Sequence, residues 1–154
     1  MLILYLELPT FKMKLLPMKQ TNNPGRLVLI GEDDIDDEEI LKEVFESIDT
    51  SFQVEFMNNG QTIIKFLEEL KNEEMPCLII LDYNMPALNG AEILKRLNSN
   101  EQIKHVPKII WSTSNAAAYK KMCLESGACD YLVKPNKIKD LENMIRHMLS
   151  YCKS

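Results

Sequence analysis

Short apolar segments alternate with amphipathic segments of helical period along most of the chain, and this alternation constrains the fold more than any other feature. The apolar segments are continuous, as expected of parallel strands covered on both faces by helices. Strands are predicted at 27–30, 52–56, 77–81, 108–111 and 130–133. Helical stripes are predicted at 40–48, 63–70, 93–97, 116–123 and 138–149. The pattern therefore predicts an α/β fold with a doubly wound, five-stranded parallel sheet and helices on both faces.

The 154 residues correspond to one domain of ordinary size. Regular patterning begins only after Pro24-Gly25. We therefore interpret residues 1–25 as an N-terminal extension, either flexible or the product of a start site upstream of Met18, and residues 26–152 as the domain. The opening MLILYLEL is far shorter than the roughly 20 apolar residues of a membrane span, and it lacks the basic start of a signal peptide.

The charge balance is mildly acidic. With 18 Lys and Arg against 23 Asp and Glu, the formal net charge is −5. Nucleic-acid binding through a basic face needs clustered Lys and Arg, so this balance argues against such a partner and leaves a protein partner open.

The cysteines and histidines lack the spacing of a metal site. Cys77, Cys123, Cys129 and Cys152 are scattered without a C-x-x-C pair, and the two histidines, His105 and His147, lie far apart. We interpret the four cysteines as reduced and structural, which would fit a cytoplasmic protein. Cys129 is expected to pack near the fifth strand.

Polar residues follow the predicted strands at the point where each strand ends. Glu32 and Asp33 follow the first strand, Asp82 follows the third, Ser112 closes the fourth and Lys134 follows the fifth. In open α/β sheets, ligands bind outside the carboxyl ends of the strands. The sequence therefore predicts that these five residues meet at one edge of the sheet.

Each of these residues also has a simpler interpretation. The acidic residues at 32–39 could complement the N-terminus of a helix, an effect of about 0.3–1 kcal/mol each. We favour that interpretation for the acids after Asp33. Asp82 could form a turn, Ser112 could end a strand and Lys134 could be a solvated charge. Their joint placement at the functional edge favours a site.

The residue types suit phosphoryl chemistry. Clustered carboxylates repel one another unless a cation lies among them, and Mg²⁺ prefers oxygen ligands. An Asp carboxylate can act as a nucleophile and form an aspartyl-phosphate. A Lys amine and a hydroxyl could bind the remaining phosphoryl oxygens.

Four blocks together carry a family resemblance: GEDDIDD (31–37), LIILDYNMPALNG (78–90), IIWSTS (109–114) and YLVKP (131–135). In this order and spacing they resemble the receiver domain of two-component response regulators, over about residues 26–150. The resemblance implies a flavodoxin-like sheet with strand order 2-1-3-4-5.

The resemblance also implies roles around a metal ion. Asp82 resembles the phosphoacceptor. Glu32 and Asp33 resemble the acidic pair that holds Mg²⁺, with Asp33 as the more direct ligand, because the longer Glu32 side chain could act through water. Together with Asp82, the backbone carbonyl of Asn84 would complete the protein's share of the metal shell.

Further positions match the residues that bind the phosphoryl group and report its presence. Lys134 would pair with the phosphoryl group, and its bond to Pro135 would be cis. Ser112 resembles the switch hydroxyl and Tyr131 the switch aromatic. Trp111 is interpreted as a core residue, and the methionines at 122, 144 and 148 as helix packing.

On this interpretation the chain is a stand-alone receiver and not an enzyme beyond its own phosphorylation and dephosphorylation. A histidine kinase or phosphotransfer protein would donate the phosphoryl group, and an unknown protein would receive the output, with no nucleic acid or membrane involved. Pairing of two copies stays open. A pseudo-receiver that acts without phosphorylation is the first alternative. An aspartyl-phosphate phosphatase is disfavoured because Asn84 stands where a second Asp is usual, and a nucleotide-binding protein because no Gly-rich loop follows the first strand.

Overall fold

A computed structural model describes residues 26–152 of the chain. The interpretation of residues 1–25 as an extension lies outside these described residues. Among the described residues, no helix combines the length and apolar character needed to cross a membrane.

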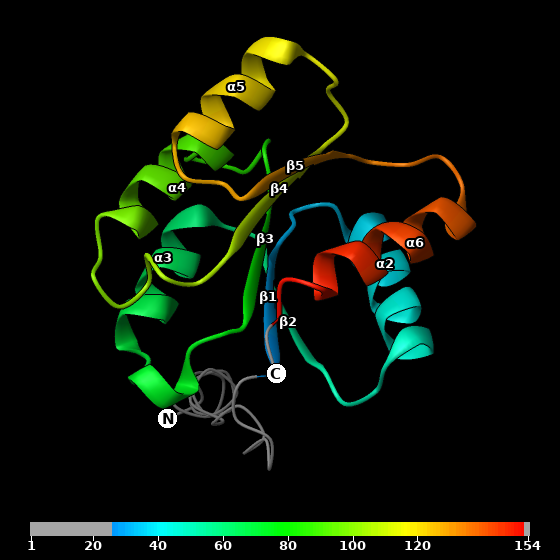
Figure 1. The fold of residues 1–154 in the computed structure, drawn as a ribbon, viewed down its shortest axis with the longest axis horizontal. Helices are drawn as coiled ribbons and strands as arrows, with labels where there is room; N and C mark the ends of the chain where they lie inside the picture. Colours follow the sequence, from blue (N-terminus) through cyan, green and yellow to red (C-terminus); the bar gives the residue numbers. More distant parts are fainter. Residues whose placement is uncertain (1–25, 153–154) are drawn as a thin grey trace, which may run out of the picture.

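Five parallel strands form one sheet in the order β2-β1-β3-β4-β5 (Figure 1). The strands are β1 (Leu27–Gly31), β2 (Gln53–Met57), β3 (Leu78–Asp82), β4 (Lys108–Ser112) and β5 (Asp130–Val133). The helices are α2 (Ile35–Ile48), α3 (Gly60–Glu69), α4 (Gly90–Asn98), α5 (Ala117–Glu125) and α6 (Ile138–Leu149), with a short 3₁₀ turn η1 (Asn72–Glu74) before β3. The predicted fold class and strand order are confirmed.

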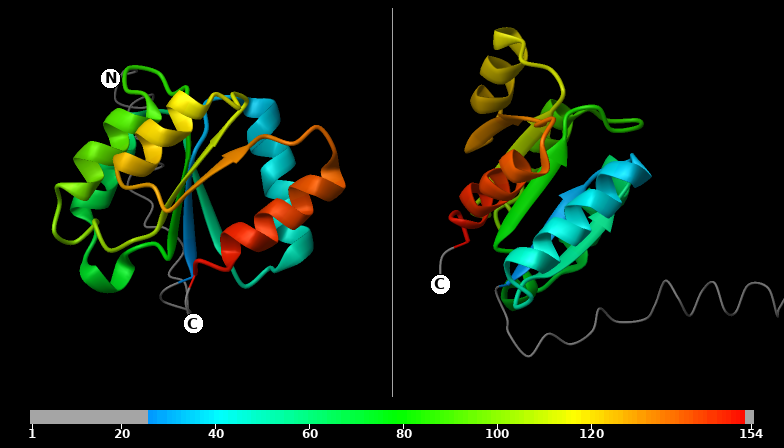
Figure 2. Two further views of the ribbon diagram at one scale, coloured as in Figure 1. Left: turned by 45° about the horizontal axis from the view of Figure 1, so that its top comes forward. Right: turned by 90° about the vertical axis from the view of Figure 1, so that its right-hand side faces the viewer.

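Helices cover both faces of the sheet, with α3, α4 and α5 on one face and α2 and α6 on the other (Figure 2). Every residue of β1, β3 and β4 is buried, which explains why the interior of each of these strands is continuously apolar. The edge strand β2 is only partly buried and retains the alternation of Phe and Val with polar residues. Both faces therefore carry a core, and the strand ends are left to form a site.

Local capping signals place the helices next to the strand ends. Asp34 caps α2, because its side chain accepts hydrogen bonds from the backbone N–H groups of Asp36 and Asp37 at 2.9 and 3.1 Å. After α5, Gly127 adopts a φ of +103°, a conformation that glycine reaches without steric cost. For Asp34, the predicted role at a helix N-terminus is confirmed.

The predicted helical stripes are buried less completely than expected. Met122 on α5 remains 37% exposed and Ile138 on α6 58% exposed, and Ile40 on α2 is also exposed. In α5, only Cys123 is buried. The interpretation of Met122 as packing is therefore wrong, because α5 buries Cys123 and leaves Met122 at the surface.

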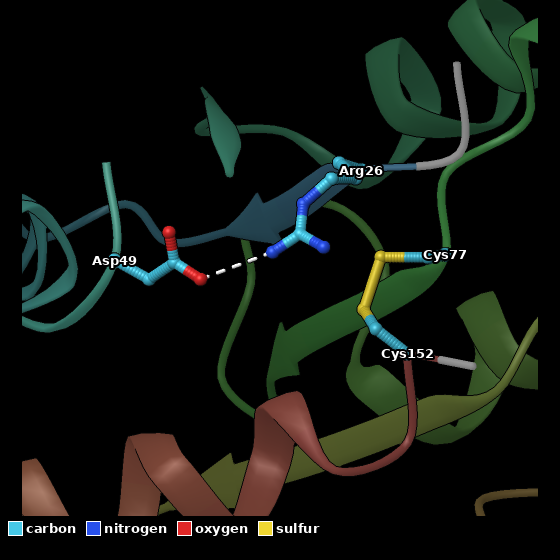
Figure 3. Close-up of a disulfide and its surroundings, with 4 residues drawn as sticks. All are labelled: Arg26, Asp49, Cys77 and Cys152. Atoms are coloured by element: carbon cyan, nitrogen blue, oxygen red, sulfur yellow. Dashed lines mark hydrogen bonds and ion pairs between the residues drawn. A yellow bond between two sulfur atoms is a disulfide. The ribbon is translucent and has the colours of Figure 1, made fainter. Parts of the chain in front are cut away.

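At the amino-terminal ends of the strands, away from the candidate site residues, a disulfide joins Cys77, just before β3, to Cys152, just after α6 (Figure 3). The prediction that all cysteines are reduced is wrong for this pair, since folding brings together residues separated by 75 positions. Cys123 is a buried free thiol. Cys129 immediately precedes β5, as expected, but it is exposed and its thiol donates to the Lys108 carbonyl at 3.1 Å.

Candidate functional site

The carboxyl ends of the strands bring the predicted residues together. Glu32 follows β1, Asp82 ends β3, Ser112 ends β4 and Lys134 follows β5. The Lys134 ammonium lies 3.0 Å from Glu32 Oε2 and 2.8 Å from Asp82 Oδ2. The sheet order explains this contact, because β1, β3, β4 and β5 are neighbours in that sequence across the sheet.

Lys134 is the positive centre of the site. Besides its contacts with Glu32 and Asp82, the Lys134 Nζ donates to Asp37 Oδ2 at 2.8 Å. The Lys134 side chain is 12% exposed. Burial lowers the pKa of Lys134, but the hydrogen bonds to Asp37 and Asp82 and the nearby negative charges outweigh this effect. The pKa therefore lies above its usual value, and the amine stays protonated at neutral pH.

Glu32 is a buried carboxylate that accepts three hydrogen bonds. Its residue is 1% exposed, Oε1 accepts the Asp34 N–H at 3.1 Å, and Oε2 accepts the Trp111 indole N–H at 3.1 Å as well as Lys134. Burial raises the pKa of Glu32 to about 7, and the charge of Asp82 adds to this rise. Near neutral pH this carboxyl group is therefore close to its protonation midpoint.

Glu32, Asp33 and Asp82 form an acidic triad. Each offers a carboxylate oxygen, and these oxygens lie within 4.8 Å of one another. Glu32 and Asp82 are buried, whereas Asp33 is exposed. An all-oxygen donor set with one open side suits Mg²⁺, which keeps several of its waters when it binds to carboxylates. The donor set of the triad thus fits the predicted ion.

Asn84 lies beside this triad. Its backbone N–H donates to Asp82 Oδ1 at 3.0 Å, and its side chain is exposed. This contact orients the Asp82 carboxylate while Oδ2 faces Lys134. The suggested role of the Asn84 carbonyl as a metal ligand stays a prediction.

The two predicted switch residues meet at Ser114. Ser112 is fully buried, and its Oγ accepts the Ser114 N–H at 3.1 Å. Tyr131 is 4% exposed, and its hydroxyl donates to the Ser114 carbonyl at 2.8 Å. One residue of the loop after β4 therefore contacts both side chains.

Two residues of the site, Asp37 and Trp111, are not predicted from the sequence to belong to it. Asp37 was assigned to the helix end, yet its carboxylate pairs with Lys134 because the first turn of α2 faces the loop after β5. Trp111 packs in the core as predicted, and its indole also bonds Glu32 and lies 4.8 Å beneath the Lys134 ammonium.

The predicted cis bond between Lys134 and Pro135 is wrong. None of the described peptide bonds, over residues 26–152, is cis. The trans form is the intrinsically favoured state of a bond before proline, by about 0.5–1 kcal/mol. In this trans arrangement Lys134 still reaches all three carboxylates.

Comparisons with known proteins agree with this geometry. The profile of the response regulator receiver domain matches residues 28–146. The response regulator Rcp1 of Synechocystis is 28% identical over 137 residues, which cover 87% of this chain and 93% of Rcp1. The two-component response regulator ORR5 of Oryza sativa subsp. japonica is 32% identical over 117 residues, covering 75% of this chain and 85% of ORR5.

Solved structures have the same fold. The Mn²⁺-bound form of Rcp1 superposes with a TM-score of 0.72 at 26% identity, covering 84% of this chain and 96% of that one. The response regulator RPA3017 of R. palustris, from red light signalling, gives a TM-score of 0.73 at 30% identity, covering 81% and 92% of the two chains. With its sheet order, its acidic triad and the lysine that faces it, the chain belongs to the response regulator receiver domain family.

Proposed function

We propose that this chain is a stand-alone receiver that accepts a phosphoryl group on Asp82 in a Mg²⁺-dependent reaction. The donor would be a histidine kinase or a histidine phosphotransfer protein. The observation that supports this most is the position of Asp82, whose Oδ2 lies 2.8 Å from the Lys134 ammonium and which belongs to the acidic triad. A nucleophile, a fixed cation and a set of metal ligands thus adjoin one another.

The proposed transfer uses each group of the site. A carboxylate oxygen of Asp82 attacks the phosphorus, a P–O bond forms, and the P–N bond to the donor histidine breaks with its electron pair returning to the imidazole. Lys134 then binds phosphoryl oxygens in place of the Asp82 carboxylate, and the Ser112 hydroxyl supplies a further hydrogen bond.

Glu32, Asp33 and Asp82, with the Asn84 carbonyl, would hold Mg²⁺. When bound, the ion would offset the charge between the attacking carboxylate and the phosphoryl group. The Rcp1 structure that superposes on this chain is described as Mn²⁺-bound, which supports a divalent cation in this family. Trp111 and the Asp34 backbone hold Glu32 in place for this role.

The acceptor is tested by mass spectrometry. Wild type and Asp82→Asn are incubated with Mg²⁺ and a small acyl-phosphate donor, and their intact masses are recorded. We expect a phosphoryl adduct on wild type only, and its loss when a chelator is added. An unmodified wild type would contradict the proposal and favour the pseudo-receiver, which binds partners without phosphorylation.

Phosphorylation would act through Ser112 and Tyr131. We propose that Ser112 moves toward the phosphoryl group and breaks its contact with Ser114, and that Tyr131 is thereby held inward, the position it already occupies here at 4% exposure. This changes the face formed by α5, β5 and α6; of these elements, α5 carries the exposed side chains of Tyr119, Met122 and Leu124.

The switch is tested with beryllium fluoride, which mimics the phosphoryl group. In the presence of Mg²⁺ we expect the amide resonances of residues 112–150 to shift in wild type and to stay fixed in Asp82→Asn. Identical amide spectra with and without beryllium fluoride in wild type would contradict the switch.

We propose that the receiver domain spans residues 26–152, that the protein works in the cytoplasm, and that its only chemistry is phosphorylation and dephosphorylation of Asp82. Its output partner would be a protein that binds the face of α5, β5 and α6, and neither a nucleic acid nor a membrane. A second copy of the chain could bind the same face.

A further inference from the structure

A disulfide lies at the amino-terminal ends of the strands, whereas the acidic triad lies at their carboxyl ends. Cys77 precedes β3 and Cys152 follows α6, and their Cα atoms are 4.9 Å apart. Both residues are partly exposed. The bond therefore attaches the C-terminal turn of the domain, Ser150–Cys152, to the sheet.

The start of β1 lies beside this bond. The Cys77 N–H donates to the Leu27 carbonyl at 2.8 Å, which places Cys77 across from the start of β1, just after Arg26. Figure 3 shows the Arg26 guanidinium between the Asp49 carboxylate and the disulfide, and Arg26 donates to Asp49 at 3.0 Å. Arg26 is thus paired with Asp49, and its guanidinium also stacks 4.1 Å over the Phe52 ring.

A chain of hydrogen bonds leads from the disulfide to the switch aromatic. Tyr151, next to Cys152, donates its hydroxyl to Asp130 Oδ2 at 3.1 Å. The other oxygen, Asp130 Oδ1, accepts the backbone N–H of Tyr131 at 2.8 Å. His147 of α6 also contacts Asp130 Oδ2, at 2.8 Å. One carboxylate thus joins the C-terminal turn to the start of β5.

We propose that Cys77 and Cys152 form a reversible redox site for dithiols, and that its state is transmitted to Tyr131 through Tyr151 and Asp130. A thiolate of the dithiol attacks one sulfur of the bond and forms a mixed disulfide. This first step releases the other protein cysteine as a thiolate. The second thiol of the dithiol then attacks the mixed disulfide and releases the cysteine that was bound to it. The protein disulfide takes up two electrons and two protons, and the dithiol becomes a cyclic disulfide.

Reduction removes the covalent attachment of the C-terminal turn. The Tyr151 hydroxyl then loses its fixed position against Asp130, whereas His147 keeps its contact because α6 stays packed through the buried Ile145 and Met148. The Asp130 carboxylate then keeps its contact with His147 and loses the one with Tyr151. The hydrogen bond that its Oδ1 accepts from the Tyr131 N–H changes as a result.

The redox step is tested on the full chain carrying Cys129→Ser, which removes the exposed free thiol and leaves Cys123 buried. The protein is treated with dithiothreitol in native buffer, alkylated with N-ethylmaleimide and weighed intact. We expect two alkyl groups per chain and an unchanged circular dichroism spectrum. In a second sample that is reduced but not alkylated, oxidised glutathione should restore the disulfide. A bond that is reduced only in denaturant, or a chain that unfolds on reduction, would overturn the proposal.

The transmission step is tested by amide spectra of the same protein, without phosphorylation, so its outcome is independent of the function proposed for Asp82. On reduction we expect the Tyr131 amide resonance to shift. In Tyr151→Phe, which keeps the disulfide but lacks the hydroxyl, the same reduction should leave that resonance in place. A Tyr131 resonance that stays fixed in the parent protein, or shifts equally in both proteins, would refute transmission through Tyr151.

Discussion

The indole N–H of Trp111 donates a hydrogen bond of 3.1 Å to Glu32 Oε2, across a sequence separation of 79 residues. The same oxygen accepts the Lys134 ammonium at 3.0 Å. Trp111 is the one tryptophan of the chain, so its fluorescence reports directly on the acidic triad. This contact also connects the ends of β1 and β4 through side chains.

Mg²⁺ affinity should depend on pH through Glu32. Burial raises the pKa of this carboxyl group to about 7, so a proton occupies it at lower pH and competes with the cation. We expect the affinity to fall by up to about tenfold for each pH unit below 7 and to level off above it. Titrations of Mg²⁺ followed by Trp111 fluorescence at pH 6 and pH 8 measure this change. Glu32→Gln is the control and should lack the step near pH 7, and equal wild-type affinities at the two pH values would contradict the prediction.

Removing Lys134 should destabilise the metal-free protein. In Lys134→Met, the carboxylates of Glu32, Asp37 and Asp82 lose their shared positive partner, and breaking a buried ion pair typically costs about 3–5 kcal/mol. Urea unfolding with and without Mg²⁺ should show that the cation restores part of this loss.

The matched control for that prediction is Asp37→Asn. The Asp37 side chain is 35% exposed, so its loss should cost less than about 1 kcal/mol and leave the other two ion pairs intact. If Lys134→Met were as stable as Asp37→Asn, the central role of Lys134 in the site would be wrong.

Lys108 should make stability rise at alkaline pH. This residue is 1% exposed, its Nζ donates to the carbonyls of Ile103 and Val106 at 2.8 and 2.7 Å, and burial lowers its pKa to about 8. Because the unfolded chain holds this proton up to higher pH, the free energy of unfolding should rise between pH 8 and about 10.5, by roughly 2–3 kcal/mol.

Unfolding of wild type and Lys108→Met at pH 7.5 and pH 10 checks this sign. The variant has no titrating group at the position, so its stability should lack that rise after the shared effects of pH are subtracted. Parallel pH dependences of the two proteins would rule out a depressed pKa at Lys108.

Much of the fold follows from local patterns in the sequence. Continuously apolar strands such as 27–30 and 78–81 are buried on both faces, which is why their pattern predicts a parallel sheet. Because parallel strands end at the same side of a sheet, the same patterns predict that Asp82 and Lys134 lie together. The strand order came from the family resemblance, because periodicity within a strand does not specify its neighbours.

What the sequence left open depends on contacts between distant segments. The pairing of Asp37 with Lys134 requires the orientation of α2 against the loop after β5, and four cysteines allow several disulfide connectivities. The pairing of Cys77 with Cys152 arises because α6 runs back along the sheet and ends near the start of β3. Such contacts are set by the packing of whole elements.

The most direct test of the account locates the phosphoryl group. Wild-type protein phosphorylated with Mg²⁺ and an acyl-phosphate donor is treated with borohydride, which reduces an aspartyl-phosphate to homoserine, and its peptides are sequenced by mass spectrometry. The account predicts homoserine at position 82 and unmodified Glu32 and Asp33. Homoserine at any other position, or none at position 82 in protein that carries the adduct, would contradict it.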